Sequence, residues 1–246
     1  MSKFRIPKST IPNTATSLNI FSGFLSVIFA SQGDFHLAAL SIFVATFFDL
    51  IDGLLARLTK TASPFGVELD SLADVVSFGL APSFLIYQSY FINYNYWGIV
   101  ISSSILIFGA LRLARFNVQV EDIKIKQDFN GLPIPIAAIT VASFILFYHN
   151  GINIIRPFNI LLTPTIIILS LLMVSNIRYN AIPKTKNMTL FAKTSIYTLA
   201  VILLILIYIT NGKAFFYLIS FHILFGIFRH IYISFFNKTS IIKNKS

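Results

Sequence analysis

Long apolar runs separated by short polar segments dominate this chain of 246 residues. A helix that crosses a bilayer needs about 20 mostly apolar residues. Runs of that length recur along the chain, and turn-forming segments such as Gln32-Gly33-Asp34 and Asn211-Gly212 separate some of them. We predict eight membrane-spanning helices: Thr14–Ser31, Leu37–Leu58, Gly66–Phe91, Tyr96–Phe116, Leu132–His149, Pro157–Ile177, Thr194–Asn211 and Ala214–Phe235.

The composition agrees with this pattern. Hydrophobic residues make up 56% of the chain and charged residues 11%, whereas soluble domains carry about 25% charged residues. We therefore expect an all-α, polytopic transmembrane bundle that forms one integral membrane domain over residues 1–246. Basic residues precede the first apolar run, as in a signal peptide, but many spans follow, so we expect this run to remain as the first span.

The distribution of Lys and Arg predicts the orientation in the membrane. With eight spans and a cytoplasmic N-terminus, 17 of the 19 basic residues lie on the cytoplasmic side, and only Arg156 and Lys213 lie outside. This bias follows the positive-inside rule, so we expect both termini in the cytoplasm. It also accounts for the net charge of +10 without a nucleic-acid partner. The chain has no cysteine, which excludes disulfide and thiol chemistry.

Four aspartates interrupt the second and third apolar runs. Asp49 and Asp52 are three residues apart, and Asp70 and Asp74 are four apart, so each pair lies on one face of its helix. A short polar loop joins the two helices, which makes them antiparallel neighbours. At about 1.5 Å per residue, Asp52 lies roughly 9 Å from the cytoplasmic end of its helix and Asp49 somewhat deeper, while Asp70 and Asp74 lie at about 6 and 12 Å on the facing helix. We therefore expect one cluster of carboxylates in the cytoplasmic half of the membrane.

A carboxylate in hydrocarbon costs roughly 2.5–3.5 kcal/mol on insertion scales, and four like charges cannot all stay ionised unaided. Oxygen-only ligands suit hard divalent cations. We expect two cations per site, Mg²⁺ or Mn²⁺, with Ca²⁺ as the alternative. Because Mg²⁺ also binds substrate phosphates, a phosphate near the lipid headgroups is the expected ligand.

The residues around the aspartates suit a phosphate ligand. Gly53 and Gly66 allow a ligand to approach the helix backbone closely, and Ala56 has only a small side chain on the same surface. Arg57 supplies a planar fork for phosphate oxygens, and Ser63 can donate a further hydrogen bond.

The complete pattern is Asp49-x-x-Asp52-Gly53-x-x-Ala56-Arg57, eight residues, then Gly66-x-x-x-Asp70-x-x-x-Asp74. It resembles the signature of the CDP-alcohol phosphatidyltransferase family at every fixed position. The resemblance implies an integral membrane enzyme with a six-helix core, here residues 11–177, followed by two additional spans over 194–235. It also implies a homodimer and an active site that faces the cytoplasm, in a bacterial or archaeal cell membrane.

The same resemblance implies roles for individual residues. The four aspartates hold the metals, and Asp74 is also the general base. Contacts to the CDP part of a CDP-diacylglycerol substrate are expected from residues of the motif and from the segment Pro12-Asn13-x-x-Thr16: Asn13, Thr16, Gly53, Ala56, Arg57, Ser63 and Gly66.

Segments that overlap or follow the aspartate motif narrow the choice of acceptor alcohol. Ser63–Pro82, Ala110–Asn117 and Phe129–Pro135 resemble the membrane-type phosphatidylserine synthases of the family. The implied reaction is transfer of a phosphatidyl group to L-serine, with release of CMP, an EC 2.7.8 type of phosphotransfer in phospholipid biosynthesis.

Four residues are candidates for acceptor binding. Arg112 and Arg115 lie three apart at the end of the fourth predicted span and could receive a carboxylate or a phosphate. Glu68 and Ser77 lie near the aspartates and could meet an ammonium group. The two arginines could equally be ordinary cytoplasmic anchors, and the other two a simple polar lining. Asn117 is a candidate helix cap.

Two alternative functions remain open at this point. The first is the same chemistry with another alcohol acceptor, either glycerol 3-phosphate, inositol phosphate or choline. The second is a cation transporter that uses the acidic residues as an ion path. Transport sites lie near the membrane midplane on broken helices, whereas these aspartates lie toward one leaflet beside an arginine, which favours phosphate chemistry.

Overall fold

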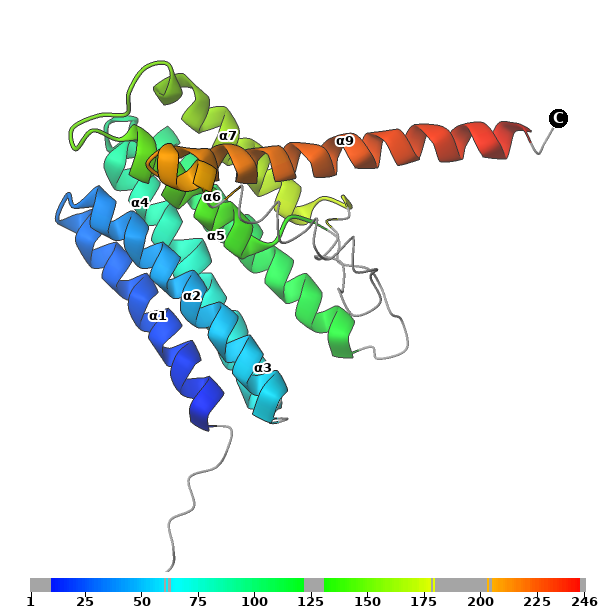
Figure 1. The fold of residues 1–246 in the computed structure, drawn as a ribbon, viewed down its shortest axis with the longest axis horizontal. Coiled ribbons are helices and arrows are strands. Elements are labelled where there is room, and N and C mark those ends of the chain that lie inside the picture. The colour runs from blue at the N-terminus through cyan, green and yellow to red at the C-terminus, as the bar shows by residue number, and fades with distance from the viewer. Residues whose placement is uncertain are drawn as a thin grey trace, which may run out of the picture. The chain divides into compact units, whose positions relative to one another are not determined.

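The computed structural model describes residues 10–59, 61, 63–121, 131–177, 179, 203 and 205–243, and the regular elements in these ranges are helices (Figure 1). Five of them are long and apolar enough to cross a membrane, and two shorter helices are also apolar. This confirms the predicted all-α, multi-pass membrane class. The chain divides into two compact units, Met1–Ile125 with Pro133–Val174, and Lys126–Leu132 with Ser175–Ser246.

The first unit begins with a helical hairpin. Helices α1 (Thr10–Ser31) and α2 (Phe35–Thr59) lie side by side along their length (Figure 1). The predicted turn joins them, and Gly33 adopts a φ of +87°, which glycine reaches without the strain that a Cβ would add. Because the turn is short, α1 and α2 run antiparallel, and the start of α1 lies beside the end of α2.

The third span is made of three helical segments in direct succession. They are α3 (Pro64–Asp74), the π-helix η1 (Val75–Leu80) and α4 (Ala81–Ser89). Ser63 caps α3, because its Oγ accepts the N–H of Gly66 at 3.1 Å, and Pro64 occupies the first turn. The π-helical segment was not predicted from the sequence, and it begins directly after Asp74.

The remaining helices of the first unit are α5 (Asn95–Glu121), α6 (Ile134–Tyr148) and α7 (Phe158–Val174). They correspond to the fourth, fifth and sixth predicted spans, with α6 and α7 shorter than expected. A short 3-10 helix, η2 (Phe91–Asn93), precedes α5. Asn117 lies inside α5, so the prediction that it caps a helix is wrong.

Small residues allow the helices of the first unit to approach closely. A Cβ added to Gly23 of α1 would lie 2.7 Å from Cα of Ser77 in η1, and one added to Gly79 would lie 3.6 Å from Cα of Leu106 in α5. Such contacts are typical of helix packing in membranes. They place the π-helical segment between α1 and α5, with the third span in contact with both.

The second unit contains helix α9 (Lys213–Lys243), which covers the eighth predicted span. It begins at the predicted turn, where Gly212 has a φ of +86°. Within this unit, the ring of Tyr179 packs against Gly226, and its hydroxyl donates to the carbonyl of Ile223 at 3.4 Å. Residues 194–202 and 204 of the seventh predicted span, Thr194–Asn211, lie outside the described residues, as do the first two residues of the flanking segment Phe129–Pro135.

Candidate active site

Helices α2 and α3 bring the four aspartates together. One carboxylate oxygen from each of Asp49, Asp70 and Asp74 lies within 4.8 Å of the other two. Asp49 and Asp74 also share a side-chain hydrogen bond. Asp52 joins the group electrostatically, because its charge acts on both Asp49 and Asp70. The i, i+3 and i, i+4 spacings of the motif therefore produce the expected cluster.

Two carboxylate oxygens of this cluster suit a cation. Oδ2 of Asp52 and Oδ1 of Asp74 are buried, and neither has a hydrogen-bond partner within the described part of the chain. The Asp52 side chain is only 5% exposed. A buried anionic oxygen without a donor is costly unless a cation or a hydrogen bond compensates it. The donor set consists of carboxylates, which fits hard divalent cations.

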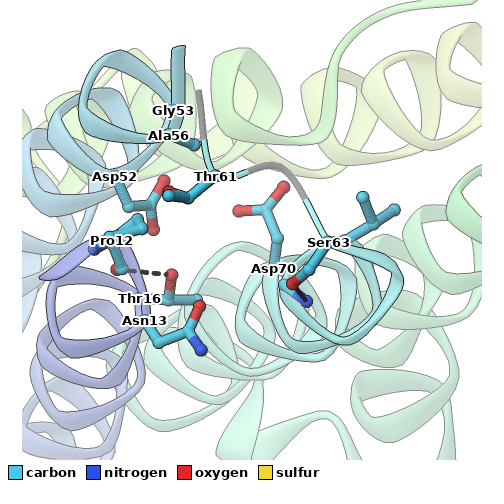
Figure 2. A pocket seen from close by; sticks show the side chains of 11 residues that line it. Pro12, Asn13, Thr16, Asp52, Gly53, Ala56, Thr61, Ser63 and Asp70 are labelled. Atoms are coloured by element: carbon cyan, nitrogen blue, oxygen red, sulfur yellow. Dashed lines mark hydrogen bonds between the residues drawn. The ribbon is translucent and has the colours of Figure 1, made fainter. Parts of the chain in front are cut away.

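A pocket of about 120 Å³ opens beside Asp52 and Asp70. The start of α1, the end of α2, the connecting loop and the start of α3 all contribute to it, and Figure 2 shows the two carboxylates facing the same space. The lining residues are Pro12, Asn13, Thr16, Asp52, Gly53, Ala56, Thr61, Ser63, Gly66, Val67 and Asp70.

Six of the seven predicted CDP contacts line this pocket, all except Arg57. The sequence analysis did not single out Thr61 or Val67. The signal that could have indicated them is their closeness in the sequence to Ser63 and Gly66: Thr61 lies in the loop after α2, and Val67 in the first turn of α3. Segments far apart in the sequence thus form one polar cavity next to the carboxylate cluster.

Known proteins resemble the chain over these same segments. A family model described as CDP-alcohol phosphatidyltransferase matches residues 9–165, which include the pocket and all four aspartates. The chain belongs to the CDP-alcohol phosphatidyltransferase family. Members of this family depend on divalent metal ions, and the cluster of Asp49, Asp70 and Asp74 could bind such ions.

Several named relatives are similar to the chain. The CDP-diacylglycerol–serine O-phosphatidyltransferase of Helicobacter pylori is 37% identical over 98% of both chains. The protein of the same name from Methanocaldococcus jannaschii is 38% identical over 74% of this chain and 80% of its own length. An archaetidylserine synthase from Methanothermobacter thermautotrophicus is 41% identical over 55% of this chain and 58% of its own length.

Arg57, the arginine of the family motif, is exposed at the end of α2. Its Nε donates to the carbonyl of Gly53 at 2.8 Å. In this conformation the guanidinium lies against its own helix and does not line the pocket. Because the side chain is long and exposed, it has to change rotamer to contact a ligand there.

The candidates for acceptor binding lie in different surroundings. Arg112 of α5 is half-buried and interacts electrostatically with Asp74, and its Nε has no hydrogen-bond partner among the described residues. Arg115 and Glu68 are exposed. Ser77 is fully buried, and its Oγ donates to the carbonyl of Asn19 at 2.9 Å. The structure therefore brings Arg112 to the aspartates and engages Ser77 with α1.

Asn117 takes part in a contact that the sequence did not reveal. Its Nδ2 donates to Oγ of Ser71 at 3.1 Å. Ser71 follows Asp70 directly, so this hydrogen bond connects α5 to α3, the helix that carries Asp70 and Asp74. The 46-residue separation of the two side chains explains why local spacing could not indicate the pair.

Proposed function

We propose that this protein transfers the phosphatidyl group of CDP-diacylglycerol to L-serine, which gives phosphatidylserine and CMP. The observation that carries this proposal is the 36–37% identity to the two Helicobacter pylori CDP-diacylglycerol–serine O-phosphatidyltransferases across 98% of each chain. Similarity of this extent covers the acceptor side of the site as well as the family motif. The protein is thus a phosphotransferase of phospholipid biosynthesis.

The pocket beside Asp52 is the proposed site for the CDP group. Asn13, Thr16 and Ser63 offer polar groups around it, while Gly53, Ala56 and Gly66 leave room for the nucleotide. Arg57 would turn from its own helix toward the diphosphate, where a guanidinium can donate two parallel hydrogen bonds. The lipid tails remain in the bilayer, because the pocket is at the end of membrane-spanning helices.

Asp49, Asp52, Asp70 and Asp74 are the proposed ligands of two divalent cations, Mg²⁺ or Mn²⁺. When bound, such ions would neutralise the diphosphate and make CMP a better leaving group. The orphaned oxygens of Asp52 and Asp74 support this proposal.

Asp74 is the proposed general base. It would accept the proton of the serine hydroxyl as the hydroxyl oxygen attacks the β-phosphorus and the bond to CMP breaks. The half-buried guanidinium of Arg112 acts on Asp74 from α5, and we assign it to the serine carboxylate. Arg115, Glu68 and Ser77 remain weaker candidates for the acceptor site, because two are exposed and the hydroxyl of the third is engaged with α1.

We also propose the finer architecture. The helices from α1 to α7 would form the six-span catalytic core over residues 11–177, and two further spans over 194–235 would follow. The bias of basic residues supports cytoplasmic termini and a cytoplasmic active site in a bacterial or archaeal cell membrane. A homodimer is expected from the family alone.

The deciding experiment is a panel of acceptors. Purified protein with CDP-diacylglycerol and Mn²⁺ should release CMP with L-serine but not with glycerol 3-phosphate, inositol phosphate or choline. A chelator should stop the reaction, and added Mn²⁺ should restore it. CMP release with a different alcohol would show that this alcohol, and not L-serine, is the acceptor. Ion flux in liposomes without any CMP release would favour a transporter.

A second candidate concerns the lipid donor. The archaetidylserine synthase relative is 41% identical over 138 residues, 55% of this chain. The same panel should therefore include CDP-archaeol beside CDP-diacylglycerol. Higher kcat/KM with CDP-archaeol would assign the protein to ether lipids, with serine as the acceptor in both cases.

A further inference from the structure

Asn19 of α1 is a buried polar residue that the proposed reaction does not use. Its side chain is 0% exposed, and both its Nδ2 and its Oδ1 lack a hydrogen-bond partner within the described residues. Buried amides in folded proteins are almost always paired, because the unpaired group forfeits its hydrogen bonds to water. An unpaired amide in a membrane helix therefore calls for an explanation.

The position of Asn19 relates it to the carboxylate cluster. It lies one helical turn beyond Thr16, on the same face of α1, and Thr16 is within hydrogen-bonding reach of Asp52. Because α1 and α2 are antiparallel, a step of three residues toward the end of α1, from Thr16 to Asn19, matches a step of three residues toward the start of α2. That step leads from Asp52 to Asp49, so Asn19 is level with Asp49.

A contact with the third span also places Asn19 at the depth of the aspartates. The hydroxyl of Ser77 donates to the backbone carbonyl of Asn19 at 2.9 Å, and Ser77 lies three residues after Asp74. Asn19 is thus within about one turn of both members of the Asp49–Asp74 pair. Oδ1 of Asp74 also lacks a partner among the described residues.

The chemistry of the groups is complementary. An amide offers two N–H donors, whereas carboxylates that ligate cations offer only acceptors. Oxygens of ligating carboxylates are normally held by hydrogen bonds from residues that do not touch the metal themselves. Among the described residues, Asn19 is a buried, uncharged side chain whose donors have no hydrogen-bond partner.

We propose that Asn19 is a positioning residue of the metal site. Its amide donates to an oxygen of the Asp49–Asp74 pair when cations are bound, and so fixes the orientation of these ligands. The same helix carries Asn13 and Thr16 in the nucleotide pocket. Asn19 therefore also keeps the nucleotide-binding face of α1 in register with the metal ligands. This inference rests on the proposed metal-dependent function.

The test measures the binding of Mn²⁺ alone to purified protein by electron paramagnetic resonance, without substrate. Asn19→Leu keeps the volume of the side chain and removes its donors. We expect roughly 10- to 100-fold weaker Mn²⁺ binding than in the wild type. Asn19→Ala carries the same expectation and is the variant to measure if the leucine variant aggregates.

Ser26→Ala is the matched control. Ser26 lies on α1 two turns beyond Asn19, is also 0% exposed, and its Oγ also lacks a partner among the described residues. We expect this variant to bind Mn²⁺ as the wild type does, because Ser26 is remote from the aspartates.

Three results would contradict the positioning role of Asn19 or the proposed metal site on which it rests. Wild-type Mn²⁺ affinity in Asn19→Leu, together with higher thermal stability, would show that Asn19 is only an unpaired buried amide. An equal loss of affinity in Ser26→Ala would point to a general packing effect. No Mn²⁺ binding by the wild type would instead overturn the proposed metal site itself.

Discussion

At the scale of single residues, the two glycines of the family motif differ in what surrounds them. A Cβ added to Gly53 would meet only Nη2 of Arg57, at 4.0 Å, whereas one added to Gly66 would lie 3.3 Å from Oγ of Ser63 and 3.5 Å from Oδ1 of Asn13. Gly53 therefore borders open space in the pocket, while Gly66 allows the cap of α3 to form. The same residue type thus borders open pocket space at one position and permits a helix cap at the other.

We predict that Gly53→Ala weakens substrate binding without weakening the fold. The added methyl group would enter the pocket, so the KM for CDP-diacylglycerol should rise several-fold. Alanine is favoured over glycine in a helix by about 1 kcal/mol, so thermal stability should stay the same or increase. Steady-state kinetics and heating followed by size-exclusion chromatography measure the two effects, and a fall in stability with unchanged KM would contradict the prediction.

A second residue-scale prediction concerns Asp74. Asp74→Asn keeps the shape of the side chain but removes the proposed base and a metal ligand, so CMP release should fall at least 100-fold, within the range of general-base catalysis. Asp34→Asn is the control, because Asp34 is exposed in the turn at the other end of α1 and α2. Near-normal turnover by the Asp74 variant would refute the base assignment.

At the scale of elements, the contact between α1 and the π-helical segment holds the site together. Gly23 packs against Ser77, whose hydroxyl bonds to the carbonyl of Asn19 in α1. A π-helix is rare and is found frequently at functional sites. Here it begins directly after Asp74, the last residue of α3. The packing of η1 on α1 therefore fixes the position of Asp74.

We predict that Gly23→Ala destabilises the protein by about 1–3 kcal/mol, because the new methyl group overlaps Ser77 and forces the helices apart. The neighbouring Phe24 is exposed on the outer face of α1, so Phe24→Leu should leave stability nearly unchanged. The fluorescence of Trp97, the one tryptophan in the chain, can follow thermal unfolding in detergent. Equal melting temperatures for Gly23→Ala and the wild type would contradict the packing argument.

His149, directly after the end of α6, packs against the start of α2. This side chain is 3% exposed, its Nδ1 accepts the N–H of Gly151 at 3.0 Å, and its ring meets Phe35 edge-on at 4.8 Å. Burial, and secondly the charge of His36, lowers the pKa of His149 from its usual 6.5. The unfolded chain therefore binds a proton more readily than the folded one.

Stability should accordingly fall on acidification from about pH 7 to pH 5, because the unfolded state gains the proton at a higher pH than the folded state. His149→Asn, which keeps an acceptor but cannot titrate in this range, should reduce this loss. His222→Asn, on an exposed part of α9, should leave it unchanged. Melting temperatures across the pH range test the prediction, which fails if the wild type and His149→Asn depend on pH in the same way.

At the scale of the whole molecule, the absence of cysteine allows a direct test of topology. Ile152, in the loop between α6 and α7, is 81% exposed, and Val118, near the end of α5, is 66% exposed. In the proposed orientation these two positions lie on opposite sides of the membrane. The site at the ends of α2 and α3 then lies on the same side as Val118.

We predict that a membrane-impermeant maleimide labels Ile152→Cys in intact cells, and labels Val118→Cys only after the membrane is permeabilised. Retained CMP release by each variant serves as the folding control. The reverse labelling pattern would place the aspartates on the outer face and would contradict a reaction with cytoplasmic serine.

The sequence by itself determined the helical membrane class, the first six helices in outline and the gathering of the four aspartates. These features depend on local quantities: the length of an apolar run, the repeat of 3.6 residues and the shortness of a loop. The turn at Gly33 follows from the same local rules, and the position of Ser63 follows from the loop between the two halves of the motif. Asn13 was expected only from the resemblance to the family. The shorter lengths of α6 and α7 were not predicted, because hydropathy locates an apolar run but not the residue at which the helical hydrogen bonds end.

Only the tertiary structure decided which face of each helix meets which neighbour. It directed Arg112 toward Asp74 and Ser77 toward α1, although both were equal candidates in the sequence. It also buried Asn19 without a partner and paired Asn117 with Ser71. The rotation of a helix about its own axis depends on contacts between residues distant in the chain. Hydropathy in a membrane protein does not report that rotation, because both the lipid-facing and the protein-facing sides are apolar.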